Sequence, residues 1–111
     1  LKRAGLDYRD MAEVRQYEHW NAFTGQNPNM PLWAFSTRGS VPYHEAGFCK
    51  GDGLLFGPES RGLPDDVLGE FPAGRRLRLP MRQDSRSLNL SNTVAVGLYE
   101  GLRQLGFENL Y

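Results

Sequence analysis

Three short segments of the sequence gather side chains that could bind a polar ligand. They cover residues 36–40, 57–62 and 80–89, and all three are rich in glycine, serine, asparagine and arginine. Glycine lets the backbone approach a ligand closely, because it has no Cβ. Hydroxyl, amide and guanidinium groups hydrogen-bond ribose or phosphate oxygens. These segments are therefore the first candidates for a functional site.

The third segment holds more hydrogen-bonding side chains than the start of a helix requires. Within it, Arg86 is a candidate contact for a phosphate or a ribose. Alternatively, Asp84 could form a structural ion pair with Arg82 or Arg86. Tyr99 lies further along, one residue off the apolar stripe of the helix that follows. Packing at a helix edge or interface and a role with substrate remain equally open for Tyr99.

Several common site types are absent from the sequence. The segment after residue 57 lacks the Gly-Lys-Ser/Thr of a P-loop and the G-x-G-x-x-G spacing of a dinucleotide site. Neither histidine has an evident serine and carboxylate grouping for a hydrolase triad. Cys49, His19 and His44 are too few and too scattered for zinc, so no metal site is expected. A doubly wound hydrolase or nucleotide-binding domain remains only as a remote alternative.

Composition indicates one globular domain without a membrane segment. The chain has 111 residues, and no apolar run approaches the roughly 20 residues of a membrane span. A single cysteine excludes an internal disulfide and fits a cytoplasmic protein. The formal net charge of zero argues against strong, indiscriminate nucleic-acid binding. Arginines nevertheless crowd one stretch, at Arg75, Arg76, Arg78, Arg82 and Arg86.

Short apolar runs predict the strands that would carry these segments. Residues 31–36, 53–56 and 76–79 are typical of strands, and 12–17 is a weaker candidate. A short helix is expected over about 19–23. Each of the three clear strands leads directly into one of the candidate segments.

A long amphipathic helix follows the third segment. Its apolar residues recur at spacings of four and three, at Leu90, Val94, Leu98, Leu102 and Leu105. Ser87, Asn89 and Ser91 suit its start, and Gly106 is expected to end it. A second helix should follow Pro64. Strands separated by helices predict an α/β domain with a mostly parallel sheet, whose ligands bind beyond the carboxyl ends of the strands.

Longer motifs in these same segments resemble a known superfamily. LLFGPESRGLP at 54–64, LPM at 79–81 and DSRSLNLSN at 84–92 are similar to the second and third signature motifs of SPOUT-superfamily RNA 2′-O-methyltransferases. Within that superfamily the sequence most resembles the single-domain bacterial enzymes that methylate cytidine or uridine 34 of tRNA. AGLDY at 4–8 adds to the likeness, which extends over residues 1–107.

The resemblance implies a fold, a cofactor and an assembly. The domain would carry a C-terminal trefoil knot that binds S-adenosylmethionine, mostly through backbone groups, and releases S-adenosylhomocysteine. The implied enzyme is a cytoplasmic homodimer that acts on tRNA, and its C-terminal helix, carrying Tyr99, would lie at the dimer interface. The cofactor contacts expected from the motifs are Phe35, Thr37, Gly57, Glu59, Leu79, Ser87 and Asn89.

The resemblance also implies roles on the substrate side. Arg86, Ser85 and Asn89, with Tyr99, are expected to bind the RNA or organise the site. No metal is needed, because the methyl group of a sulfonium is already activated. The enzyme must orient a ribose 2′-hydroxyl in line with that methyl group and help to remove its proton.

One motif of the superfamily is absent. An Asn-x-Gly-Asn-x-x-Arg motif normally lies in an N-terminal strand and helix, and Arg15 and Arg38 do not replace it. We therefore expect the N-terminal strand-helix portion to be missing, with residues 1–107 as the remaining domain. Residues 108–111 match the start of an engineered protease site and are expected to be a tag remnant. The alternatives are a non-catalytic fragment that binds S-adenosylmethionine, and a related rRNA 2′-O-methyltransferase.

Overall fold

The computed structural model describes residues 16–17, 19–57, 62–79 and 90–107. The expected tag remnant at 108–111 lies outside these residues, as does most of the expected strand at 12–17. Gln16 and Tyr17, the two residues of that strand that are described, are not in a strand.

The centre of the molecule is a parallel sheet of four strands. These are β1 (Leu32–Phe35), β2 (Val41–Pro42), β3 (Gly53–Leu55) and β4 (Arg76–Arg78). Their order is β2-β4-β1-β3, and every neighbouring pair is parallel. The three clear strands expected from the sequence and the mostly parallel sheet are confirmed. β2 was not expected, because two residues are too short for a periodic pattern.

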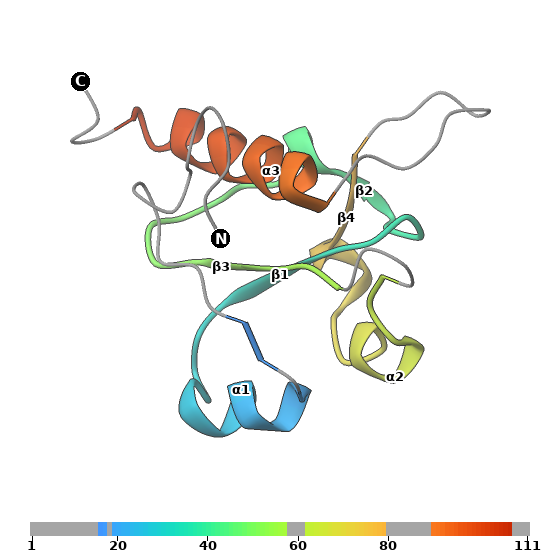
Figure 1. Ribbon diagram of the computed structural model, residues 1–111. Helices are drawn as coiled ribbons and strands as arrows, with labels where there is room; N and C mark the ends of the chain where they lie inside the picture. Colours follow the sequence, from blue (N-terminus) through green and yellow to red (C-terminus); the bar gives the residue numbers. More distant parts are fainter. Residues whose placement is uncertain (1–15, 18, 58–61, 80–89, 108–111) are drawn as a thin grey trace.

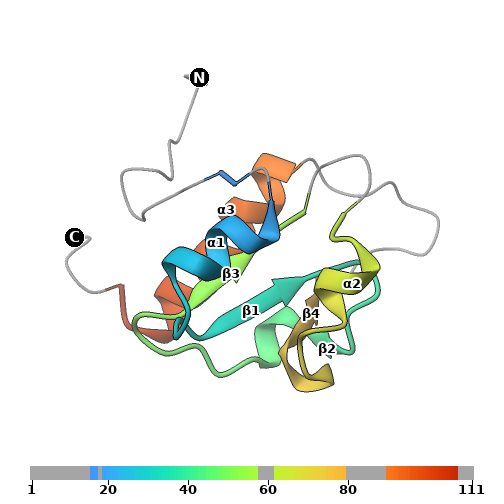
Figure 2. The ribbon, with the colours of Figure 1, turned by 90° about the horizontal axis from the view of Figure 1, so that it is seen from below.

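Helices cover both faces of this sheet. α3 (Leu90–Gln104) lies over one face, while α1 (Trp20–Gln26) and α2 (Asp65–Leu68) lie against the other (Figure 1). The view from below shows α1 and α2 in front of the strands, with α3 behind them (Figure 2). Two 3-10 turns, η2 (Tyr43–Glu45) and η3 (Ala73–Arg75), complete the described elements. No helix in the described part of the chain is long and apolar enough to cross a membrane.

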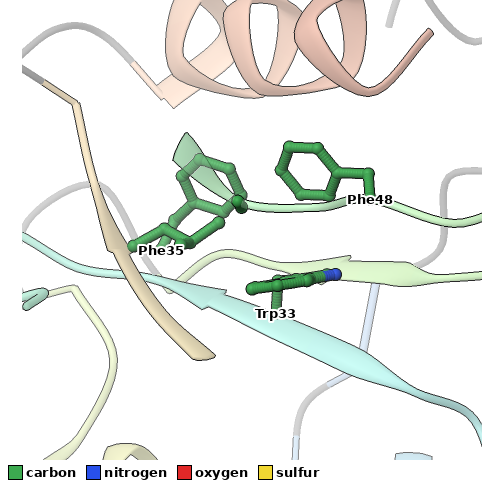
Figure 3. Packing of buried hydrophobic residues seen from close by; sticks show 5 residues of the cluster. Trp33, Phe35 and Phe48 are labelled. Atoms are coloured by element: carbon green, nitrogen blue, oxygen red, sulfur yellow. The ribbon is translucent and has the colours of Figure 1, made fainter. Parts of the chain in front are cut away.

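Alternation along β1 divides the core into two clusters. Successive side chains of a strand point to opposite faces of the sheet. Trp33 and Phe35 therefore pack with Phe48 on the side that α3 covers (Figure 3). Ala34, between them in the sequence, packs on the other side with a cluster that includes Leu68 of α2. Burial of these apolar surfaces on both faces holds the helices to the sheet.

α3 contacts the sheet through a glycine. The one residue of α3 that is fully buried is Gly97, while the residues of the predicted apolar stripe are half-buried. A Cβ at Gly97 would lie 3.0 Å from Phe35 Cζ and 3.3 Å from Phe56 Cζ. These two rings stack at 4.6 Å between centroids and fill the space under the helix. A glycine at the crossing point therefore lets the helix backbone approach, and the leucines flank the contact half-buried.

The end of α3 agrees with the sequence prediction. Gly106 has a φ of 79°, a conformation that favours glycine. Its N–H donates to the Arg103 carbonyl at 3.0 Å, and the Phe107 N–H donates to the Leu102 carbonyl at 2.8 Å. This pair of hydrogen bonds is the Schellman motif, which satisfies carbonyls left open at a helix end.

Candidate active site

The first and second candidate segments meet at one edge of the sheet. β1, β3 and β4 are mutually parallel, so the chain leaves all three at their shared carboxyl edge. The described parts of the segments are residues 36–40 after β1 and Gly57 and Gly62 after β3. The third segment, residues 80–89, lies outside the described residues, and Leu79 after β4 is the last described residue before it. This edge is where ligands bind in parallel α/β sheets. The expectation that the first and second segments lie together is confirmed for these residues, and the place of the third segment stays a prediction.

The first segment carries the chain across β4. Leu77 of β4 is in register with Phe35 on one side and with Val41 on the other, so only residues 36–40 span the strand. The Ser36 N–H donates to the Leu77 carbonyl at 2.9 Å, and the Ser40 N–H donates to the Arg76 carbonyl at 3.0 Å. The segment is thus fixed to β4 by its backbone on both sides of the crossing.

Gly39 lies at the point of closest approach in this crossing. A Cβ there would be 2.5 Å from both the carbonyl carbon and the oxygen of Leu77. Because these are backbone atoms in the centre of the sheet, they cannot move aside as a flexible side chain would. Gly39 is required by the chain's own packing, whatever ligand binds nearby.

A tight turn presents the polar side chains of the first segment. The Arg38 N–H donates to Ser36 Oγ at 3.0 Å, and the Gly39 N–H donates to the Ser36 carbonyl at 3.1 Å. Thr37, an expected cofactor contact, is exposed in this turn. The Arg38 guanidinium pairs with the carboxylate of Asp65 at the start of α2, which links the first segment to the element after the second.

The second segment closes tightly on itself. A Cβ at Gly57 would overlap the backbone of Gly62 and Leu63. Gly62 has a φ of 68°, and the Leu63 side chain beyond it is buried. Gly57 is therefore required by the chain's own packing, and its expected contact with a cofactor stays a prediction. Glu59 lies outside the described residues.

Phe35 and Leu79 stand at the same edge with different degrees of burial. The Phe35 side chain is only 6% exposed and belongs to the core beneath α3 (Figure 3). Its ring packs against Phe56 and Gly97, so only the backbone of Phe35 is available to contact a cofactor. Leu79 is half-buried and packs against the same cluster. Four further predicted site residues, Ser85, Arg86, Ser87 and Asn89, lie outside the described residues.

Tyr99 lies on the outer side of α3. It is two residues from Gly97, and a step of two in a helix turns a side chain about 200° away from the sheet. The centroid of its ring lies 6.4 Å from the centroid of the Phe107 ring. It borders an open groove of about 390 Å³, lined by Tyr43, Ala95, Val96, Tyr99, Glu100, Arg103 and Phe107. The groove suits the interface role predicted for Tyr99, and the substrate role stays a prediction.

A hydrogen-bonded cluster beside this groove was not anticipated from the sequence. The Arg103 guanidinium donates to both carboxylate oxygens of Glu100, at 2.9 and 2.8 Å, and the Gln104 amide donates to the same carboxylate at 2.8 Å. The hydrogen bonds from Arg103, partly opposed by burial and assisted by Gln104, lower the pKa of Glu100 from 4.5 to about 2. The i,i+3 and i,i+4 spacing of these residues was the available signal.

The arginine-rich stretch is divided between structural and exposed side chains. The Arg75 guanidinium lies 3.9 Å from the centroid of the Trp33 ring. Arg76 Nε donates to the Phe71 carbonyl at 2.8 Å, whereas Arg78 is exposed. The described part of the stretch is therefore not a continuous basic patch. Within the described ranges, no group of three histidine, cysteine or acidic side chains could hold a metal ion.

Fold and edge geometry define a class: a parallel α/β ligand-binding domain with glycine-rich segments at the carboxyl edge. Comparison with known families then identifies the particular group. The pattern of the SpoU rRNA Methylase family matches residues 1–99, and the chain belongs to this family. The resemblance to SPOUT methyltransferases is confirmed at that level.

Curated relatives cover almost the whole chain. A Burkholderia ambifaria protein named tRNA (cytidine(34)-2'-O)-methyltransferase is 53% identical over 110 residues, which are 97% of this chain and 70% of that protein. An Escherichia coli K12 protein of the same name is 44% identical over 107 residues, which are 96% of this chain and 68% of that protein. The chain therefore spans about two thirds of their length.

Solved structures share the fold. One, described as "Structural insights into the 2-OH methylation of C/U34 on tRNA", superposes with a TM-score of 0.77 at 48% identity. The match covers 95% of this chain and 64% of that chain. An AdoMet-bound rRNA methyltransferase from Sinorhizobium meliloti superposes with a TM-score of 0.66 at 29% identity, over 78% of this chain and 33% of that one.

Proposed function

We propose that the chain is the cofactor-binding part of an S-adenosylmethionine-dependent enzyme that methylates the ribose 2′-hydroxyl of nucleotide 34 in tRNA. The observation that carries the proposal is the identity of 53% over 110 residues to a relative named for that reaction. The likeness runs through the glycine-rich segments at the carboxyl edge, where a ligand would bind. A cytoplasmic location, where tRNA is found, is part of the proposal.

The carboxyl edge supports a proposal that the cofactor is held mainly by backbone groups. Gly39 and Gly57 let backbone segments pack closely against one another at this edge. Backbone N–H and C=O groups near Phe35, Gly57 and Leu79 would then hold the cofactor, with Thr37 as an exposed hydroxyl beside them. The bound cofactor supplies a methyl group activated by its sulfonium.

The remaining chemistry concerns the RNA ribose. Arg86, Ser85 and Asn89 would bind the substrate or organise the site, Glu59 and Ser87 would complete the cofactor contacts, and Tyr99 would act from α3. Their work is to orient the 2′-hydroxyl and assist loss of its proton, which can contribute factors of roughly 10²–10⁴ in rate.

Assembly as a homodimer forms part of the same proposal. The outer side of α3 carries an open groove whose floor includes Ala95 and Val96, and Val96 is 36% exposed. Apolar surface rimmed by charged side chains such as Glu100 and Arg103 is typical of an interaction surface. A second copy of the chain would cover this surface and bring the two C-terminal helices together.

Binding and turnover should be measured in sequence. Calorimetry should first detect S-adenosylmethionine binding, and transfer of a labelled methyl group to unmodified tRNA should follow. The modified ribose should then be located by its resistance to alkaline cleavage at nucleotide 34. Cofactor binding without transfer would favour the non-catalytic fragment, and transfer to rRNA alone would favour the rRNA enzyme. A chain that binds no S-adenosylmethionine would refute the proposal.

Arg86→Ala tests the predicted contact on the substrate side. Loss of a charge-assisted contact to the RNA should lower methyl transfer at least about tenfold, which corresponds to about 1.4 kcal/mol of transition-state stabilisation. Arg82→Ala, four residues earlier in the same stretch, is the matched control and should retain most activity. Unchanged transfer by Arg86→Ala would remove this residue from the site.

A further inference from the structure

Arg38 is a cation held at the carboxyl edge by a weak, exposed ion pair. Its partner is Asp65, and the two side chains are 57% and 83% exposed. Ion pairs exposed to this degree contribute at most about 1 kcal/mol to stability, because water and salt screen them. The guanidinium can therefore exchange its carboxylate for another anion at little cost to the fold.

The backbone beneath Arg38 is fixed, in contrast to its side chain. Its own N–H donates to Ser36 Oγ at 3.0 Å, and Gly39 beside it lies against the backbone of β4. Ser40, two residues on, is hydrogen-bonded to Arg76 at 3.0 Å. Because the backbone of this turn is already ordered, only the Arg38 side chain must be ordered when it binds an anion, which favours binding.

The surroundings of Arg38 contain a second exposed arginine. Arg78 lies two residues after Arg76 on β4, so alternation along the strand places both on the same face of the sheet. That face is the one against which α2 packs, as the hydrogen bond from Arg76 to Phe71 indicates. Arg38, through Asp65, reaches the same side. Two exposed arginines therefore lie near the carboxyl edge of the sheet, where the proposed substrate would bind.

We infer that Arg38 binds a backbone phosphate of the RNA substrate, and that Asp65 holds the guanidinium in place and competes with the phosphate for it. The inference rests on the proposed function for the identity of the polyanion. RNA is favoured over the carboxylate of the cofactor because Arg38 is more than half exposed. A small ligand in a pocket buries most of its contacts, whereas an RNA backbone meets a protein at its exposed cations.

Two substitutions should change RNA affinity in opposite directions. Arg38→Ala should weaken binding of unmodified tRNA about three- to tenfold and reduce the salt dependence of binding by about one phosphate contact. Asp65→Asn should strengthen tRNA binding, because it removes the competing carboxylate. Arg38→Lys should retain most of the affinity. Lys50→Ala removes one exposed positive charge just before β3, at the opposite edge, and should leave affinity unchanged.

Other results would overturn the inference. If Arg38 only ties the first segment to α2, both Arg38→Ala and Asp65→Asn will lower the melting temperature and shift tRNA affinity in the same direction. If Arg38 holds the cofactor, Arg38→Ala will weaken S-adenosylmethionine binding in calorimetry and leave tRNA affinity intact. Opposite shifts in tRNA affinity without methylation of nucleotide 34 would support the role of Arg38 and refute the proposed function. Absence of tRNA binding by the unaltered chain would refute both.

Discussion

Single glycines set the shape of the carboxyl edge. Gly39 and Gly57 each lie where a Cβ would run into backbone atoms of another part of the chain. Strand β4 fixes the position of Gly39, and the return of the chain at Gly62 and Leu63 fixes that of Gly57. Backbone atoms are therefore brought to the edge in an arrangement that no larger residue permits. The proposed binding of a cofactor by backbone groups would use the backbone exposed beside these two glycines.

Gly39→Ala should destabilise the fold through this steric conflict. Its Cβ would lie 2.5 Å from the carbonyl group of Leu77, so the crossing segment must shift away from β4. The expected loss is about 1–3 kcal/mol of unfolding free energy, measured by urea titration. Gly47→Ala is the control, because nothing lies within 4 Å of a Cβ there. Equal stability of the two variants would show that the crossing can relax.

The sequence placed Gly39 and Gly57 in the candidate segments, but it did not show why each position requires a glycine. The glycine-rich segments after apolar runs predicted close approach of the backbone to a ligand, which stays a prediction, whereas the structure shows close approach of the chain to itself at Gly39 and Gly57. The partner in each approach is the chain itself, which depends on strand order. Strand order involves contacts between residues about 40 apart, such as Phe35 with Leu77. Local sequence patterns do not show which distant strands pair with one another.

At the scale of elements, two kinds of contact hold α3 to the rest of the molecule. Gly97 packs on the stacked rings of Phe35 and Phe56. One turn beyond Gly101, the Gln104 side-chain oxygen accepts a hydrogen bond at 2.9 Å from the Phe48 backbone N–H. Gln104 also donates to Glu100, so the polar contact and the Glu100–Arg103 pair form one network. Stability of α3 should therefore depend on the ionisation of Glu100.

Acid should weaken this network. Folding lowers the pKa of Glu100 from 4.5 to about 2, so its contribution to stability is present above pH 4.5 and is lost as pH falls from 4.5 toward 2. Glu100→Gln should cost about 1–2 kcal/mol at pH 7, discounted for the 61% exposure of Arg103, and the difference from the unaltered chain should shrink in that acid range.

Urea unfolding from pH 7 down to pH 2.5 would measure this difference. Glu45→Gln is the matched control, because Glu45 is exposed in η2, and its effect should stay within about 0.5 kcal/mol. A Glu100→Gln penalty that remains constant with pH would contradict a role for the ionised carboxylate.

Elements with strong periodic patterns were predicted well. α3, its end at Gly106, and strands β1, β3 and β4 follow from apolar spacing and capping residues. The short helix expected at 19–23 exists and continues to Gln26. The burial of Gly97 against the sheet was not predicted, because an apolar pattern gives no weight to a glycine. Small residues at helix crossings reflect the size of their partners, which only the packed structure reveals.

At the scale of the whole molecule, two surfaces have different characters. The carboxyl edge is polar and contains the exposed pair of Arg38 and Asp65. The outer side of α3 is a groove with apolar residues such as Val96 and Phe107. The net charge of zero does not show this division, which would place the proposed RNA contact and the proposed self-association on separate parts of the surface. The knot and the N-terminal strand and helix implied by the resemblance stay predictions.

Val96→Glu should dissociate the proposed homodimer. Val96 and Met30 are the large hydrophobic residues exposed in the described part of the chain, at 36% and 41%. A carboxylate at position 96 would be buried against a second copy without a partner, so dimer affinity should fall at least about a hundredfold, or about 2.7 kcal/mol. Sedimentation velocity over a range of protein concentrations should show a monomer.

Met30→Glu provides the matched control for this change. It introduces the same charge at an equally exposed hydrophobic residue, in the groove bordered by α1 and not on α3. The Met30→Glu protein should sediment as the unaltered chain does, because position 30 lies outside the proposed interface. If Met30→Glu dissociates the dimer and Val96→Glu does not, the interface lies on the α1 side of the sheet. If the unaltered chain is a monomer at all concentrations, α3 does not mediate self-association in this chain.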